Sequence, residues 1–268
     1  MKILKSLLII FALLLSQSAL AAPLKILFFY PGGQGSQELA QPLLDAFADS
    51  LKKASDSQLE AKIFYIADKE KGLQFIAKEK PAAAIVSQDI AEAIQEKFKA
   101  RPIAQTLQLP SSDGSDRFVI VGAKGSPLPS SGALSLGSSR PLEAAFLQEK
   151  LFPQLKNLQL KSEATPNILG LLRAIGSLGA EPKYHFALLD QFEYANISRL
   201  KAAWVSQISV VAESQKIPSA PVLAFSENLK EPEKLAQALE KMGQNNESAE
   251  ILENLRLKGF KALAPSAP

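Results

Sequence analysis

Two segments about 90 residues apart decide the fold: Asp116 to Ser126, which reads DRFVIVGAKGS, and Val210 to Phe225, which reads VVAESQKIPSAPVLAF. Each segment joins apolar runs that are typical of strands on either side of a boundary within the chain. A chain that leaves one α/β lobe, builds a second and returns makes two such crossings. The layout predicts two lobes with a cleft at the carboxyl ends of their strands, where α/β proteins hold ligands.

The stretch before the first crossing alternates strand-like and helix-like segments. Leu24 to Tyr30 and Ala82 to Val86 are apolar runs of the kind that form buried central strands. Between them, apolar residues recur at helical spacing from Leu39 to Leu51, and Ser36 precedes this helix as an N-cap. The resulting βαβαβαβ order predicts an α/β fold of two doubly wound lobes joined by two hinge crossings.

The crossings also set the expected domain boundaries. We expect lobe one to be discontinuous, formed by residues 22–115 and 217–268, and lobe two to be residues 116–216. The hinge is expected at residues 112–118 and 212–220.

Three further helices are predicted from local signals. One begins near Pro141, because proline suits the first turn of a helix. Two closing helices, Glu231 to Met242 and Ser248 to Lys258, are predicted to pack on lobe one.

The first 21 residues have the pattern of an export signal. Lys2 and Lys5 precede the apolar run from Leu7 to Leu15, and Ala19 to Ala21 fits a small-residue cleavage site. The chain has no cysteine, so neither a lipid-anchored cysteine nor a disulfide is available. We therefore expect a periplasmic protein that is cleaved after Ala21.

Charge and motifs exclude several functional classes. Removing Lys2 and Lys5 with the signal leaves 28 basic against 27 acidic side chains, which argues against a nucleic-acid partner. The single histidine, His185, rules out multi-histidine metal motifs, and no G-x-S-x-G elbow is present. The glycines between Pro31 and Gly35 do not form a nucleotide fingerprint. We expect no catalytic residue, metal or cofactor.

Three junctions between strands and helices place polar groups where a cleft is expected. Tyr30 to Ser36 follows the first strand, Ser87 and Gln88 follow the strand AAAIV, and Ser138 to Arg140 precede the predicted Pro141 helix. A helix N-terminus offers unpaired N–H donors and a partial positive charge, which suits an anion. Each serine can instead serve only as a helix cap.

The larger polar side chains have two interpretations each. Arg140 can pair with an oxyanion of the ligand or lie solvated at the cleft rim. Asp190, which ends the strand FALLD, can bind an ammonium group or cap the next helix. Tyr30 can line the cleft or pack in the core.

These junctions, in this order, resemble the phosphate/phosphonate-type substrate-binding proteins of ABC transporters, which have a type 2 periplasmic-binding fold. The resemblance rests on YPGGQGSQELAQPLLDAF (Tyr30 to Phe47), KEKPAAAIVSQD (Lys78 to Asp89), RFVIVGAKGSPL (Arg117 to Leu128), HFALLDQFEY (His185 to Tyr194), ESQKIPSAPVLAF (Glu213 to Phe225) and LENLRLKGFKAL (Leu252 to Leu263).

The resemblance implies that hydroxyls and N–H groups at helix starts hold the ligand oxygens, through Ser87 and Gln88 on lobe one and Ser138 and Ser139 on lobe two. It also places Asp190 where the family carries an acidic or polar group. The implied function is capture of a small anionic or zwitterionic ligand by a monomer, for delivery to an ABC permease. The alternative is a receptor or scaffold of the same fold that signals to a membrane sensor.

Overall fold

The computed structural model describes residues 22–33, 35–111, 113–177, 182–225 and 227–264. The expected export signal and its cleavage site lie outside these residues. None of the helices in the described part is both long and apolar enough to cross a membrane.

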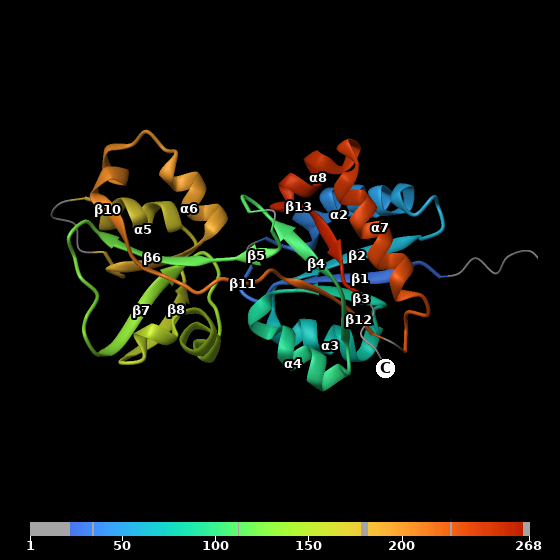
Figure 1. Cartoon of the computed structure of the whole chain (residues 1–268), viewed down its shortest axis with the longest axis horizontal. Coiled ribbons are helices and arrows are strands. Elements are labelled where there is room, and N and C mark those ends of the chain that lie inside the picture. The colour runs from blue at the N-terminus through green and yellow to red at the C-terminus, as the bar shows by residue number, and fades with distance from the viewer. Residues whose placement is uncertain (1–21, 34, 112, 178–181, 226, 265–268) are drawn as a thin grey trace, which may run out of the picture.

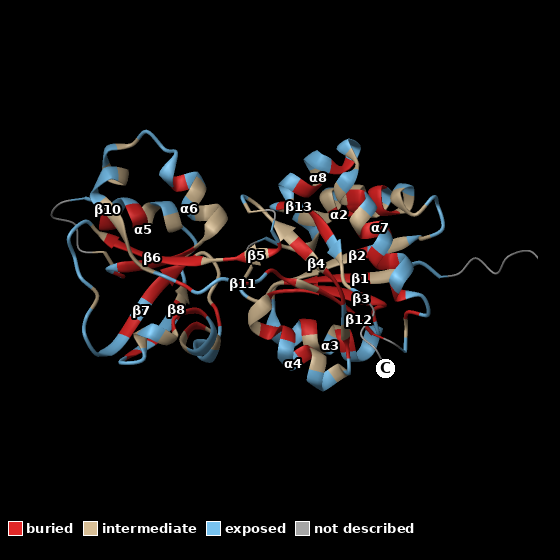
Figure 2. Cartoon of the chain, viewed as in Figure 1, coloured by how far each residue is buried: buried red, intermediate tan, exposed pale blue. Residues whose placement is uncertain are grey.

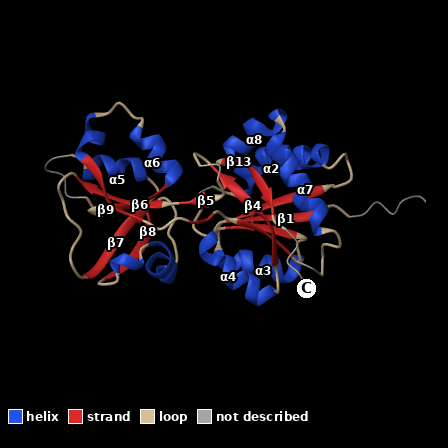
Figure 3. Ribbon diagram, in the orientation of Figure 1, coloured by secondary structure: helices blue, strands red, loops and turns tan. Residues whose placement is uncertain are grey.

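The strands and helices of the described chain form two α/β lobes (Figures 1 and 3). The strands are β1 (Leu24–Phe29), β2 (Ala61–Ile66), β3 (Ala83–Val86), β4 (Arg101–Gln108), β5 (Ser115–Asp116), β6 (Phe118–Ala123), β7 (Gly132–Ser138), β8 (Leu158–Ala164), β9 (Phe186–Asp190), β10 (Ile208–Glu213), β11 (Ile217–Pro218), β12 (Pro221–Ala224) and β13 (Leu257–Ala262). The α-helices are α2 (Gln37–Ala54), α3 (Lys69–Glu79), α4 (Gln88–Phe98), α5 (Ile168–Ile175), α6 (Gln191–Ser198), α7 (Pro232–Gln244) and α8 (Ala249–Asn254). Short π or 3₁₀ helices are η1 (Phe146–Leu151), η2 (Pro153–Leu155), η3 (Ala203–Gln207) and η4 (Asn246–Ser248).

Lobe one is a six-stranded sheet, ordered β13-β4-β12-β3-β1-β2, with its helices. Strand β1 pairs in parallel with both β2 and β3. Strand β12, which brings the chain back from the second crossing, inserts antiparallel between β3 and β4. Residues from both ends of the chain therefore build one sheet.

Helices cover both faces of this sheet because its central strands are apolar on both sides (Figure 2). In β1, Ile26 and Phe28 pack on one face with α2, α7 and α8. Leu27 and Phe29 pack on the other face with α3 and α4. Strand side chains alternate between faces, so a continuous apolar run requires two covered faces.

Lobe two is a five-stranded sheet, ordered β10-β6-β9-β7-β8, which is also covered on both faces. Phe118 and Ile120 of β6 pack with η1, whereas Val119 and Val121 pack with α5. The predicted fold class of two α/β lobes joined by two crossings is confirmed.

The two crossing segments lie side by side between the lobes (Figure 1). Strands β5 and β11 pair antiparallel, with Ile217 opposite Asp116 and Pro218 opposite Ser115. The chain thus leaves and re-enters lobe one through one short two-stranded ribbon.

Two local predictions are wrong. The segment Ser248 to Lys258 is not one helix: α8 ends at Asn254, and β13 begins at Leu257 and pairs with β4 as the edge strand of the sheet. The helix expected at Pro141 begins only at Ala144 and continues as the π-helix η1. Packing against an open sheet edge prevailed over helical periodicity in the first case.

Candidate functional site

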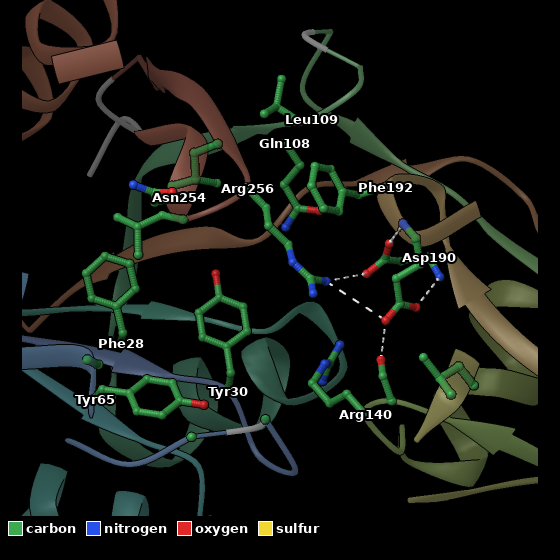
Figure 4. Close-up of a pocket in the computed structure, with 18 of the residues that line it drawn as sticks. Phe28, Tyr30, Tyr65, Gln108, Leu109, Arg140, Asp190, Phe192, Asn254 and Arg256 are labelled. Carbon is green, nitrogen blue, oxygen red and sulfur yellow. Dashed lines mark hydrogen bonds and ion pairs between the residues drawn. The ribbon is translucent and has the colours of Figure 1, made fainter. Parts of the chain in front are cut away.

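A cavity of about 640 Å³ lies between the two lobes (Figure 4). Tyr30, which directly follows β1, and Asp190, which ends β9, both line it. The N-terminal turn of α2 lines the lobe-one side, and the first turn of α6 lines the lobe-two side. The cavity therefore sits where the strand ends of the two sheets face one another, as the crossing pattern predicts.

Asp190 and Glu193 form a capping box at the start of α6. The Glu193 N–H donates to Asp190 Oδ1 at 2.7 Å, and the Asp190 N–H donates to Glu193 Oε2 at 3.2 Å. The hydroxyl of Ser139 also donates to Glu193 Oε1. Asp190 is thus a helix cap, and its second carboxylate oxygen remains directed to the cavity (Figure 4).

A third carboxyl, Asp116 on β5 of the crossing ribbon, also lines the cavity. Its residue is 8% exposed, and its Oδ1 accepts the N–H of Arg117 at 2.8 Å. Burial, followed by the charge of Asp190, raises the pKa of Asp116 to about 7. Burial also raises the pKa of Glu193, and the charge of Asp190 adds to that effect. Such shifts mark groups that are desolvated beside like charges.

Arg256, from the turn between α8 and β13, extends from lobe one toward these carboxylates (Figure 4). Its guanidinium lies 3.5 Å from Asp190 Oδ2 and 4.0 Å from Glu193 Oε1. It also lies 5.0 Å above the ring of Phe192, at cation–π distance. Arg256 therefore holds a position across the cavity from the acidic cluster.

Arg140 forms the second contact between the lobes. Its guanidinium lies 3.1 Å from Asp89 Oδ1, in the first turn of α4. The Asp89 side chain is 3% exposed and that of Arg140 is 23% exposed. Arg140 therefore lines the cavity while it is paired with Asp89.

Tyr30 and Tyr65 line the lobe-one side of the cavity (Figure 4). Burial raises the pKa of Tyr30 well above its usual range, so its phenol stays protonated and can donate a hydrogen bond. Gly33 permits this arrangement, because a Cβ there would lie 2.5 Å from the Tyr65 hydroxyl.

The structure brings five of the eight residues predicted for ligand binding to the cavity: Tyr30, Ser36, Ser139, Arg140 and Asp190. Ser36 caps α2, accepting the Leu39 N–H at 3.4 Å. Ser87, Gln88 and Ser138 do not line the cavity. The Ser138 hydroxyl donates to the Arg140 carbonyl at 2.8 Å.

The start of α4 carries two polar atoms without partners in the described part of the chain. Ser87 is the N-cap residue and is 1% exposed, yet its Oγ makes no cap bond. Gln88 Oε1 is likewise buried without a partner. Ser138 to Arg140 do not stand at a helix start, because no helix begins at Pro141.

Sequence reasoning missed three charged residues of the cavity: Asp116, Glu193 and Arg256. The Asp190/Glu193 spacing does match a capping box, which was a usable signal. Arg256 carried none, because its position depends on β13 pairing with β4.

Two α/β lobes joined by a paired crossing, with charged groups of both signs facing a cavity between them, define a two-lobed solute-binding protein. More specifically, the chain belongs to the family of periplasmic substrate-binding proteins of phosphonate ABC transporters, whose model matches residues 34–267. The family predicted from the sequence is therefore confirmed.

Solved structures agree on the fold. The chain resembles a binding protein component of an ABC phosphonate transporter from Pseudomonas aeruginosa, with a TM-score of 0.61 and 16% identity over 90% of this chain and 82% of that one. For PhnD1 from Prochlorococcus marinus, in complex with methylphosphonate, the TM-score is 0.60 and the sequence identity 14%, over 90% of this chain and 93% of that one. For a protein from Xanthomonas citri bound to ATP, the TM-score is 0.65 and the sequence identity 12%, over 91% of this chain and 92% of that one. No curated protein matches the chain in sequence.

Proposed function

We propose that this protein captures a small zwitterion, with an oxyanion such as phosphonate or phosphate and an ammonium group, in the cavity between its lobes. The family supplies the transport role, and PhnD1 with bound methylphosphonate supports the anionic part of this assignment.

One observation carries the ammonium part of the proposal. Asp190 and Glu193 present carboxylates to the cavity from lobe two, and a cation from lobe one, Arg256, already approaches them at 3.5 and 4.0 Å. These distances are long for charge-assisted hydrogen bonds, which favour about 2.7–2.9 Å. A ligand ammonium can approach the same oxygens more closely than this loose ion pair.

The groups available to an oxyanion lie beside the carboxylates. Arg140 and Arg256 both line the cavity, and Tyr30 keeps its phenolic proton. Guanidinium groups bind phosphonate and phosphate oxygens in a bidentate manner. In this proposal the ligand site keeps three predicted residues, Ser139, Arg140 and Asp190. Asp116, Glu193 and Arg256 are added to it. Ser36, the N-cap of α2, also belongs to the site.

Capture would proceed by closure of lobe one, residues 22–115 and 217–268, on lobe two, residues 116–216. The paired β5–β11 ribbon supports a hinge there, because it is the short connection between two separately packed sheets. In this proposal the mature chain begins at Ala22, acts as a monomer in the periplasm, and delivers its ligand to an ABC permease. It performs no catalysis.

The test compares matched ligands on the mature protein by titration calorimetry, with 2-aminoethylphosphonate, ethylphosphonate and ethylamine as probes. We expect binding of the phosphonates and tightest binding of the zwitterion. Asp190→Asn isolates the charge, because asparagine caps a helix as well as aspartate does. This variant should weaken the binding of 2-aminoethylphosphonate at least tenfold, while the affinity for ethylphosphonate should stay within about twofold of the wild type.

Two results would count against the proposal. Absence of binding by all three probes would reject a small oxyanion ligand. Equal loss of both phosphonates in Asp190→Asn would show that Asp190 supports the fold of the site and does not recognise ammonium.

A further inference from the structure

The cavity has an apolar half that a small zwitterion leaves unused. Its charged lining residues are Asp116, Arg140, Asp190, Glu193 and Arg256. The lining contributed by α2 carries no charge: it consists of Leu39, Ala40, Leu43 and Leu44, preceded by Ser36. Figure 4 shows the same polarity, with Phe28 and Tyr65 at one end and Asp190 at the other.

The apolar half includes large apolar side chains that are exposed to solvent. Four large apolar residues are exposed in the described part of the chain: Leu39, Leu169, Tyr194 and Leu200. Two of them, Leu39 at 79% and Leu169 at 51%, line this cavity. They stand in the first turns of α2 and α5, so they approach the cavity from opposite lobes.

The helical pattern of α2 explains how this surface arises. Its apolar face runs from Phe47 and Leu51, which are fully buried, through Leu43 to Leu39. The apolar face thus continues past the core into the cavity, where an amphipathic helix would ordinarily change to polar residues. A continuous strip of this kind is typical of a binding surface for an apolar group.

We propose that the ligand is amphiphilic, with a zwitterionic phosphonate or phosphate head at the charged end and an uncharged alkyl or aryl substituent along Leu39 and Leu43. The inference rests on the proposed function and adds the class of substituent. The occupant of the apolar half is the remainder of the same ligand, because both halves belong to one continuous cavity. A volume of about 640 Å³ falls in the range of pockets for drug-sized ligands of about 300–1,000 Å³.

The test uses a homologous series with a constant head group, from aminomethylphosphonate to 1-aminohexylphosphonate, titrated into the mature protein by calorimetry. Each added methylene that reaches the strip should tighten the dissociation constant about fourfold, the factor that corresponds to about 0.8 kcal/mol. The heat capacity change of binding should become more negative along the series.

Leu39→Ser tests the assigned surface. Its side chain is mostly exposed, so the variant should fold and bind aminomethylphosphonate normally. Its gain in affinity from aminomethylphosphonate to 1-aminohexylphosphonate should be at least threefold smaller than that of the wild type. Leu200→Ser is the matched control, because Leu200 is 44% exposed and does not line the cavity. Leu200→Ser should retain the full gain in affinity along the series.

The outcomes separate this inference from the proposed function. Equal affinity along the series, or weaker binding of longer chains, would overturn the amphiphilic ligand and leave the head-group site standing. A chain-length gain that survives Leu39→Ser unchanged would overturn the assignment to the α2 strip. Failure of every member to bind would overturn both.

Discussion

Arg140 and Asp89 form an ion pair that joins the two lobes, with 3.1 Å between the guanidinium and the carboxylate. Asp89 is almost fully buried in the first turn of α4, whereas Arg140 comes from the loop after β7. Lys150 with Glu92 and Lys69 with Glu143 also link the lobes, but all four of these side chains are about half exposed or more. The lobes are therefore joined on the α3/α4 side by one buried pair and two exposed ones.

The buried pair should dominate the stability of this contact. Arg140→Gln leaves the Asp89 carboxylate buried without its cation, which should lower the free energy of unfolding by about 3 kcal/mol. Lys150→Gln removes an exposed ion pair and should lower it by less than about 1 kcal/mol. Urea unfolding measures both. Equal losses would show that Asp89 is solvated when its partner is removed.

Asp116 should make the protein less stable as the pH rises. Its pKa is about 7 in the folded protein and about 4 in an unfolded chain, so the folded state binds the extra proton between these values. The free energy of unfolding then falls as the pH increases through that window, by about 3 kcal/mol between pH 5 and 8. Above pH 7 the full penalty is present, and below pH 4 it is absent.

Asp116→Asn should remove this contribution, because an amide does not titrate and still accepts the Arg117 N–H. Urea unfolding at pH 5 and 8 gives the comparison. Burial also raises the pKa of Glu193, so the free energy of unfolding of Asp116→Asn should still fall as the pH rises, but less steeply than that of the wild type. A slope identical to that of the wild type would mean that Asp116 is charged in the folded protein throughout.

Glu193 should contribute charge to ligand recognition. Glu193→Gln keeps a capping box at α6, since glutamine also reaches the N-cap N–H. It removes one of the two carboxylates that face Arg256. We expect 2-aminoethylphosphonate to bind about tenfold more weakly, with ethylphosphonate binding unchanged or tighter. Circular dichroism provides the control for folding, and a loss shared by both ligands would argue for a structural role.

Gly32 should control how closely the lobes approach. Its φ is +74°, and a Cβ there would lie 2.8 Å from Pro141 Cδ in lobe two. Gly35 has a similar φ of +90° but no atom within 4 Å of a new Cβ. Gly35→Ala should therefore show only backbone strain of about 1–2 kcal/mol, and Gly32→Ala a further 1–3 kcal/mol.

Small-angle X-ray scattering distinguishes the two glycine variants further. Gly32→Ala should increase the radius of gyration, because the added methyl group separates the lobes at Pro141, whereas Gly35→Ala should not. Unchanged scattering from Gly32→Ala would indicate that the loop after β7 yields without moving lobe two.

Ser87 should tolerate loss of its hydroxyl. Its Oγ is buried and has no partner among the described residues, so Ser87→Ala should leave the free energy of unfolding unchanged or raise it by about 1 kcal/mol. Thermal unfolding with and without 2-aminoethylphosphonate measures both effects. Weaker ligand binding in a variant of normal stability would return Ser87 to the ligand site, as the family resemblance implies.

Much of the fold could be predicted from local patterns. The apolar runs of β1 and β3 require two covered faces, and the crossing segments identify the two-lobed layout. Ser36 caps α2, as expected, and Asp190 caps α6, which was one of its two interpretations. The prediction failed for β13, because Leu257 to Ala262 becomes a strand only where β4 offers an unpaired edge.

The sequence by itself determined the two-lobed layout, the Ser36 cap of α2 and the family, because periodicity and helix-start chemistry depend on residues near one another in the chain. The tertiary structure alone decided which charges face the cavity. Arg256 meets Asp190 and Glu193 only because β13 pairs with β4 and the ribbon sets lobe two opposite. It also turned Arg140 toward Asp89, since the pairing of groups distant in the chain depends on how the sheets pack and not on local spacing.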